Sequence, residues 1–170
     1  AWLGRTDTGF AAFCMIVAAG SAGFLVHNFP PAKIFMGDTG STALGFLVAA
    51  CSLWGSKTGL FPLWAAILIF SPFIVDATVT LLRRLLQGEK IWEAHRTHYY
   101  QRLVLLGWGH RRTVLTEYVL MLACSGSAVL AVHFSSAGQA GLIVAWLFVY
   151  GFLMWGVGWL ERRHAKVANP

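Results

Sequence analysis

Long runs of apolar residues, separated by short polar stretches, dominate this chain. Five such runs can be distinguished, at about residues 8–29, 41–55, 60–86, 113–134 and 139–160. Because a helix needs about 20 mainly apolar residues to cross a bilayer, runs of this kind are typical of membrane spans. The second run is short, but it can be extended by the helical turn before it and by Gly55 at its end. The pattern predicts an all-α, polytopic helical bundle with about five transmembrane helices.

Prolines and polar stretches mark the boundaries between the runs. Pro30 and Pro31 end the first run and begin a loop at 30–40. Residues 87–112 form the longest polar stretch, which is too rich in cations, histidines and polar groups for any span to hold. Pro72 lies inside the third run, where it predicts a kink. We therefore expect one transmembrane domain with two functional loops.

Composition agrees with a membrane protein and excludes an ordinary soluble domain. Of the 170 residues, 57% are hydrophobic and 12% are charged, whereas soluble domains carry roughly a quarter charged residues. The three cysteines, Cys14, Cys51 and Cys124, lie in separate apolar runs without paired spacing, which indicates neither a disulfide nor a zinc site. The net charge of +6 would suit a nucleic-acid partner in a soluble protein, so the distribution of the cations decides its meaning.

The lysines and arginines gather on one predicted face of the membrane. With the loops at 30–40 and 87–112 and the C-terminal tail on the same side, eleven of the 13 Lys and Arg residues lie there, and Arg5 and Lys57 lie opposite. Cytoplasmic loops are enriched in Lys and Arg, so this face is predicted to be cytoplasmic. The bias accounts for the net charge without nucleic acid, and it lets the two loops converge at one aqueous surface.

The stretch KIFMGDTGS, at 33–41, places a carboxylate at the predicted start of a helix. Asp38, Thr39 and Ser41 stand where backbone N–H groups are unpaired and the helix dipole is positive, which favours phosphate. A carboxylate at this position can also hold a hard cation such as Mg2+. The alternative is ordinary capping, because Asp, Thr and Ser all cap helices well.

The loop at 87–112 carries the second candidate cluster. His95, His98 and Arg102 follow one another at three- and four-residue steps with Arg96 alongside, so a short interfacial helix would present them together. Imidazole and guanidinium groups are suited to neutralising a diphosphate. The spacing does not indicate zinc. A basic loop that binds anionic lipid headgroups is the alternative.

Acidic residues also occur close to or inside the runs. Asp76 follows Pro72 at membrane depth, where an ionisable group faces a protein interior or a wet cavity. Its role is either functional or structural, by satisfying the backbone freed by the proline or by pairing with a cation of another helix. Glu117 is expected at the interface near the arginines that precede it, and the tail ERRHAK, at 161–166, is expected to be solvated.

Three elements in this order resemble a known family. They are KIFMGDTGS, a Pro–Asp pair in a span that ends in two arginines, and HRTH at 95–98 in the following polar segment. The order resembles the C-terminal half of the polyprenyl-phosphate N-acetylhexosamine-1-phosphate transferases. The resemblance covers most of the chain and implies that residues 1–170 are the C-terminal portion of a single transmembrane transferase domain.

The resemblance implies transfer of a sugar 1-phosphate from a UDP-sugar to a polyprenyl phosphate, with release of UMP. It implies a Mg2+ cofactor, with Mn2+ as an alternative, held at Asp38. The matching positions assign catalytic roles to Asp38, His98 and Arg96. The residues that would bind the substrate diphosphate are Lys33, Thr39, Ser41, His95 and Arg102.

Two departures from the family limit what the resemblance implies. Known members carry adjacent histidines in the second loop, whereas here His98 is followed by Tyr99, Tyr100 and Gln101. The family's paired aspartates and nucleotide loop belong to the N-terminal half, and this sequence contains no Asp–Asp pair. We therefore expect half an active site, which would not turn over substrate alone. The loop is closer to transferases of surface-polysaccharide assembly, and the sugar stays undefined.

The resemblance also implies a location and partners. The protein is expected in the bacterial inner membrane as a multi-pass protein with its active face in the cytoplasm. Its partners would be the two substrates, the bilayer and the absent N-terminal half, and a homodimer is left open. The competing hypothesis is a non-catalytic membrane scaffold or transporter fragment with a basic lipid-binding loop.

Overall fold

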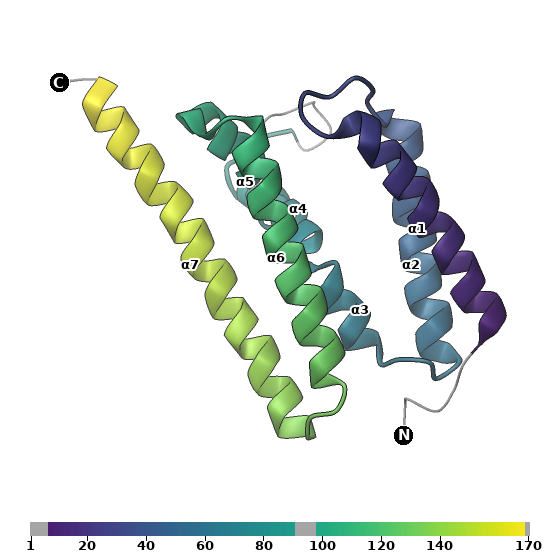
Figure 1. Cartoon of the computed structure of the whole chain (residues 1–170). Coiled ribbons are helices and arrows are strands. Elements are labelled where there is room, and N and C mark those ends of the chain that lie inside the picture. The colour runs from purple at the N-terminus through teal and green to yellow at the C-terminus, as the bar shows by residue number, and fades with distance from the viewer. Residues whose placement is uncertain (1–6, 91–97, 169–170) are drawn as a thin grey trace. The chain divides into compact units, whose positions relative to one another are not determined.

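The computed structural model describes residues 7–90 and 98–168, with side chains described as far as residue 164. Every regular element in these ranges is helical, as predicted (Figure 1). The elements are α1 (Thr8–Asn28), α2 (Gly37–Lys57), α3 (Leu63–Ile69), α4 (Ser71–Leu86), α5 (Tyr99–Leu103), the π-helical turn η1 (Val104–Trp108), α6 (His110–Ala131) and α7 (Ser136–Ala168). The chain divides into two compact units, Ala1–Ile67 and Leu68–Pro170.

Several of the described helices are suited to a bilayer. Those long and apolar enough to cross it are α1, α6 and the stretch Ser136–His164 of α7. Together, α3 and α4 pass the same test as one broken span, which raises the number from three to four. The helix α2 begins with the polar residues GDTGST and is not among these spans. The helical membrane class is thus confirmed, with three or four spans where about five were predicted.

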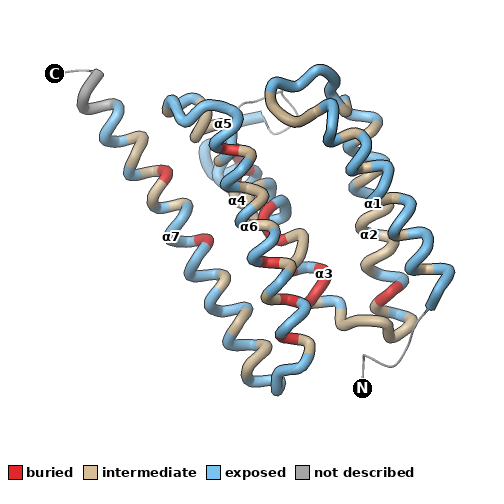
Figure 2. The backbone as a smooth tube through the Cα atoms, viewed as in Figure 1, coloured by how far each residue is buried: buried red, intermediate tan, exposed pale blue. Residues whose placement is uncertain are grey.

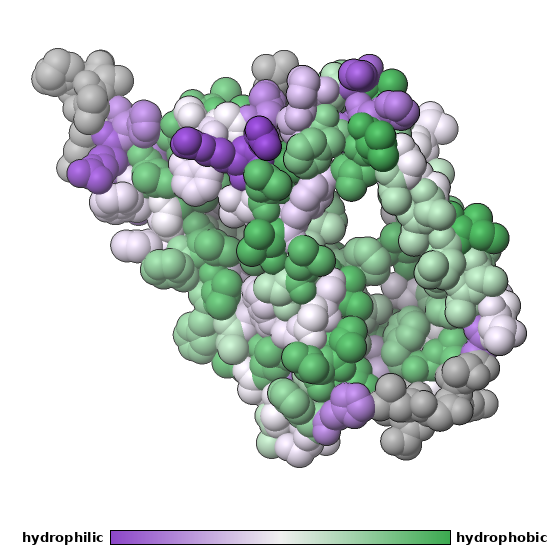
Figure 3. Space-filling view, in the orientation of Figure 1, coloured by the Kyte–Doolittle hydropathy of each residue, from purple (hydrophilic) through white to green (hydrophobic). Residues whose placement is uncertain are grey.

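The surfaces of the helices fit an apolar surrounding. The helix α1 has no buried residue, and exposed positions run along its whole length (Figure 2). In the space-filling view, apolar residues cover most of the visible helical surface, and hydrophilic residues gather towards the helix ends (Figure 3). Such exposed apolar surface would be unfavourable in water, but it is the surface that lipid or neighbouring membrane helices cover.

Aromatic side chains pack α1 against α2 in the first unit. Asp7 begins α1, because its Oδ1 accepts a hydrogen bond of 2.9 Å from the backbone N–H of Phe10. The Phe10 ring meets Trp54 of α2 edge to face, with the ring centroids 5.8 Å apart. Phe61 lies directly over the buried Gly55, where a Cβ atom would come within 2.4 Å of the ring. Glycine at this position lets the two aromatic rings approach the helix backbone.

Replacing Gly55 with Ala should destabilise the first unit. The added methyl group would displace Phe61 or shift α2, and overpacking of this kind costs about 1–3 kcal/mol. The measurement is the thermal unfolding midpoint of the purified protein in detergent. Gly45→Ala is the matched control, because it lies in the same helix and a Cβ atom added there would meet no atom within 4 Å. The control should leave the midpoint unchanged or raise it, and equal losses in both variants would contradict the packing argument.

Glycines in the left-handed conformation end α2 and α4. Gly59 has a φ of 76° and Gly88 a φ of 70°, which L-residues with side chains rarely adopt. The residue after each glycine, Leu60 or Glu89, donates its backbone N–H to a carbonyl of the last helical turn, at 2.9 Å and 3.0 Å respectively. The turn after α4 also brings the Glu89 carboxylate to 2.8 Å from Nε of the buried Arg84. The arginine charge is therefore neutralised at the end of α4.

The third predicted span is broken, as Pro72 predicted. The break falls at Phe70, between α3 and α4, and Pro72 occupies the first turn of α4, where an N–H would have no partner within its own helix. The Ser71 hydroxyl donates a hydrogen bond of 2.7 Å to the carbonyl of Leu68. A serine side chain thus satisfies one of the carbonyl groups that the break sets free.

Buried polar groups link α4, α6 and α7 in the second unit. The hydroxyl groups of Ser71 in α4 and Tyr150 in α7 share a hydrogen bond. The Sγ of Cys124 in α6 lies 3.3 Å from the same tyrosine hydroxyl. Buried positions of this unit lie on all three helices (Figure 2). These helices form the frame on which the second candidate site is built.

Candidate functional site

The first candidate site is the turn that begins α2 in the first unit. Gly37 has a φ of 67°, and Asp38 follows it in the first turn of the helix. No side chain caps this helix, and among the described residues the exposed Asp38 carboxylate has no hydrogen-bond or ion-pair partner. The Ser41 hydroxyl donates to the backbone carbonyl of Asp38 at 3.1 Å. The structure therefore does not show the capping role that was the alternative for Asp38.

The loop before α2 is tied to the end of α1. The amide of Lys33 donates to the carbonyl of His27 at 2.8 Å, and the side-chain amide of Asn28 donates to the carbonyl of Ile34 at 2.8 Å. The side chain of Lys33 is exposed. The loop is thus fixed through its backbone, which leaves its lysine and the Asp38 carboxylate at the surface of this unit.

A divalent cation would find one carboxylate in this turn. No group of three or more His, Cys, Asp or Glu side chains within the described ranges could enclose a metal ion. Mg2+ is commonly held by one or two carboxylates together with phosphate oxygens of a substrate, and it retains several waters. The exposed Asp38 therefore fits a cation that arrives with a diphosphate, and it does not fit a closed metal site built from these residues alone.

The second candidate site lies where α5 begins in the second unit. His98 precedes the first residue of α5, and its Nδ1 lies 3.3 Å from Oδ2 of Asp76 in α4. The other carboxylate oxygen, Oδ1, accepts a hydrogen bond of 2.9 Å from the backbone N–H of Tyr99. Thr80, one turn along α4, donates to the same oxygen at 3.3 Å. Asp76 therefore pairs with the imidazole of His98, a side chain from outside α4.

The far end of α5 is held by a second carboxylate. The Nε and Nη2 atoms of Arg102 donate to the two oxygens of Glu161 in α7. The guanidinium also lies over the Tyr99 ring, 4.5 Å from its centroid. The hydrogen bonds to Glu161 raise the pKa of Arg102 above its ordinary value, so the side chain stays charged. The tail that begins at Glu161 was predicted to be solvated, and this is wrong at Glu161, which continues α7 and faces α5.

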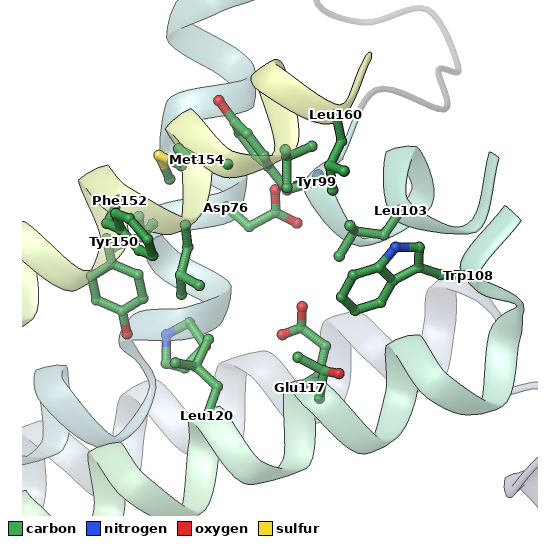
Figure 4. Close-up of a pocket in the computed structure, with 16 residues that line it drawn as sticks. Asp76, Tyr99, Leu103, Trp108, Glu117, Leu120, Tyr150, Phe152, Met154 and Leu160 are labelled. Carbon is green, nitrogen blue, oxygen red and sulfur yellow. Dashed lines mark hydrogen bonds between the residues drawn. The ribbon is translucent and has the colours of Figure 1, made fainter. Parts of the chain in front are cut away.

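A cavity of about 220 Å³ opens between α4, α5, η1, α6 and α7. Its lining is mainly apolar, with Leu103, Leu120 and Phe152 among the residues, and the carboxylates of Asp76 and Glu117 face it from opposite sides (Figure 4). Glu117 was predicted at the interface near Arg111 and Arg112. In the structure its side chain faces the cavity from α6.

The remaining predicted site residues divide between the described and undescribed parts of the chain. His95 and Arg96 lie outside the described residues. The predicted helix over 95–102 begins at Tyr99 in the described part, with His98 as its N-cap. Asp38, Thr39 and Ser41 belong to the first unit, whereas His98 and Arg102 belong to the second. The sequence pattern did not reveal the Asp76–His98 and Arg102–Glu161 pairs, although an acidic residue at membrane depth was a signal for a partner.

Together, these features define a class of protein. It is a helical membrane protein with an unpaired carboxylate at one helix start and a histidine held by a carboxylate at another. The sequence profile of glycosyl transferase family 4 matches residues 2–56, which include the Asp38 turn. The chain belongs to this family of polyprenyl-phosphate sugar-1-phosphate transferases, as the resemblance implied.

Curated relatives agree with the family. The chain is 39% identical over 117 residues to a probable undecaprenyl-phosphate N-acetylglucosaminyl 1-phosphate transferase of Bacillus subtilis, over 68% of this chain and 33% of the relative. It is 28% identical over 154 residues to the decaprenyl-phosphate N-acetylglucosaminephosphotransferase of Mycobacterium tuberculosis, over 83% of this chain and 38% of the relative. It is 34% identical over 126 residues to the phospho-N-acetylmuramoyl-pentapeptide-transferase of Oceanobacillus iheyensis, over 72% and 36% respectively.

These relatives are considerably longer than the chain. The chain spans about a third of the length of the Bacillus subtilis protein, 33%, and slightly more of the other two, 38% and 36%. No solved structure matches the chain significantly. The sequence relatives therefore carry the family assignment.

Proposed function

We propose that the protein containing this chain transfers an N-acetylhexosamine 1-phosphate from a UDP-sugar to a polyprenyl phosphate and releases UMP. The observation that carries the proposal is Asp38, an exposed carboxylate without a described partner at the start of α2, inside the region that matches the family. The relatives act on undecaprenyl or decaprenyl phosphate by their names, which supports a polyprenyl acceptor. The 170 residues alone are expected to be inactive, since they match only part of each relative.

The residues around Asp38 would bind the diphosphate of the sugar donor. Asp38 would hold a Mg2+ ion, or Mn2+ in its place, together with phosphate oxygens. When bound, the ion would neutralise charge on the transferring phosphoryl group and on the UMP leaving group. The exposed ammonium of Lys33 and the unpaired amides of the first turn of α2 would bind phosphate oxygens, with Thr39 and Ser41 as further donors.

The second unit would contribute the cationic side of the site. His98 and Arg96 would contact the diphosphate and stabilise its developing charge, with His95 beside them. Two side-chain nitrogens of Arg102 donate hydrogen bonds to Glu161. This supports a role for Arg102 in fixing α5, in place of the direct substrate contact predicted for it. Its remaining nitrogen, Nη1, is buried and has no partner among the described residues.

Both sites would open to the cytoplasm in a protein with five spans across this chain. The distribution of 13 Lys and Arg residues, eleven against two, supports this topology. On this arrangement, α2 would serve as a further span despite its polar first turn, and the bacterial inner membrane would hold the protein. A second copy in a homodimer is compatible with this topology.

The activity assay measures UMP release by the purified full-length protein. Polyprenyl phosphate, a UDP-N-acetylhexosamine and Mg2+ are supplied, and the lipid product is separated and counted. We expect UMP release that requires the lipid phosphate, since a non-catalytic scaffold or a lipid-binding loop would release none. UMP release that ignores the lipid acceptor would contradict the proposal.

Topology is tested by labelling single cysteines with an impermeant maleimide. Lys33→Cys and Lys90→Cys should react in inside-out vesicles, and Lys57→Cys should react in right-side-out vesicles, in a background without the native cysteines. The physical reason is that the Asp38 turn and the His98 segment must share one aqueous face to bind a single diphosphate. Labelling of positions 33 and 90 from opposite faces would refute the shared site.

A further inference from the structure

Both carboxylate oxygens of Asp76 contact groups at the start of α5. Oδ2 lies 3.3 Å from Nδ1 of His98, and Oδ1 accepts the backbone N–H of Tyr99 at 2.9 Å. The Thr80 hydroxyl, at 3.3 Å from Oδ1, steadies the carboxylate from its own helix. Asp76 and His98 are both partly buried, with 21% and 28% of their side-chain surfaces exposed, so water screens the pair only in part.

The geometry around the imidazole distinguishes its two nitrogens. A carboxylate at Nδ1 favours a proton on this nitrogen and limits rotation of the ring, as supporting carboxylates commonly do for functional histidines. The bond from the same carboxylate to the amide of Tyr99 fixes the backbone that carries the ring. The contacts of Asp76 thus fix both the ring and the backbone of His98 at the start of α5.

A purely structural role for Asp76 is less well supported. The carbonyl of Leu68 beside the break is satisfied by Ser71, so Asp76 is not needed there. The far end of α5 is held independently through Arg102 and Glu161. Removing the Asp76 charge should therefore leave α5 attached to the bundle while the imidazole loses its partner.

We propose that Asp76 is a positioning residue for His98 in the transferase reaction. It acts through the imidazole, by holding Nδ1 and the backbone that carries the ring, and it does not itself contact substrate. The expected effect on catalysis rests on the proposed function. The contact between Asp76 and the imidazole can be tested independently of that function.

The first test is Asp76→Asn in the full-length protein. The amide oxygen can still accept the Tyr99 N–H, whereas the NH2 group cannot accept a proton from Nδ1 of His98. We expect kcat to fall about 10- to 100-fold, as for other supports of functional histidines, with an unchanged KM for the UDP-sugar and an unchanged unfolding midpoint. Asp76→Glu, which restores the carboxylate, should recover part of the loss.

Glu117→Gln is the matched control. It makes the same chemical change on the other carboxylate of the cavity, which faces the cavity from α6 on the side opposite Asp76. The control should retain wild-type kcat. Equal losses in both variants would indicate an effect of cavity charge and would overturn the positioning role, as would a full kcat in Asp76→Asn.

A double-mutant cycle with His98→Gln shows whether Asp76 acts through the histidine. If it does, Asp76→Asn should have no further effect in the His98→Gln background, measured as residual radiolabel transfer. Losses that multiply would mean that the two residues act independently, and they would overturn the proposal.

The imidazole itself gives a readout that does not depend on activity. The histidines of the full-length protein are labelled with a nitrogen isotope, and the His98 signals are identified by their loss in His98→Gln. Asp76→Asn should shift the Nδ1 signal of His98, and Glu117→Gln should not. A wild-type protein without transferase activity would refute the proposed function alone, whereas an unshifted Nδ1 signal would refute the positioning contact.

Discussion

Asp38→Asn is expected to abolish UMP release by the full-length protein, with kcat reduced by about 1,000-fold or more. Asn keeps the size and the hydrogen-bonding capacity of the side chain but removes its charge. The proposed site supplies one carboxylate to the cation from this turn, so the loss of charge removes the ligand that would bind the ion with the diphosphate. The affinity for the UDP-sugar should fall by a smaller factor than kcat, because the charge is needed most in the transition state.

The fold should be unaffected by this change. The carboxylate of Asp38 has no described partner to lose, and no side chain caps α2. The unfolding midpoint and membrane insertion of the variant should therefore equal those of the wild type. Asp7→Asn is the matched control, because it makes the same change at the start of α1, where Asn caps as well as Asp. An active Asp38→Asn protein would favour the scaffold or transporter hypothesis.

His98→Gln should lower kcat by about 100- to 1,000-fold, within the range of contributions from a positioned acid, base or cationic donor. Glutamine removes the imidazole and its capacity for charge, while a side-chain amide remains to pair with Asp76. The measurement is the rate of lipid product formation at saturating UDP-sugar. This loss should be smaller than that of Asp38→Asn, since Arg96 and the cation would still neutralise part of the diphosphate.

Two further variants separate catalysis from lipid binding. His110→Gln changes an exposed histidine at the start of α6 and should retain full activity. His98→Lys keeps a cationic side chain, so a loop that merely binds anionic headgroups would tolerate it. The transferase site should not tolerate it, because an ammonium cannot reproduce the shape or the two nitrogens of the imidazole. Full activity in His98→Lys would therefore contradict the role proposed for His98.

Local signals in the sequence were sufficient for most of the helical boundaries. Pro30 and Pro31 follow the end of α1 closely, and Pro72 sits in the first turn after the break between α3 and α4. These residues act on the backbone within a few positions, so their effects can be read without knowing the tertiary structure. The carboxylate at the start of α2 was found in the same way, from the glycine and polar residues around Asp38.

Pairings between distant segments could not be read from the pattern. Arg102 and Glu161 are 59 residues apart, and the amide of Tyr99 is 23 residues from Asp76. Hydrophobic periodicity does not specify which face of α7 meets α5, because α7 is apolar around much of its circumference. The position of Glu117 beside the cavity was not predicted for the same reason. The membrane span count differs because α2 has an apolar body with a polar beginning.

The pair formed by Arg102 and Glu161 determines how far the C-terminus can be shortened. Glu161 lies where the sequence of α7 changes from apolar to charged residues, a position that would ordinarily be chosen for trimming a membrane protein. In a chain cut before Glu161, the Arg102 side chain, which is only 10% exposed, would lack its counter-charge. The ion pair that joins α5 to α7 would also be lost. The last turns of α7 thus belong to the functional part of the molecule, and a tag for purification is best placed beyond them.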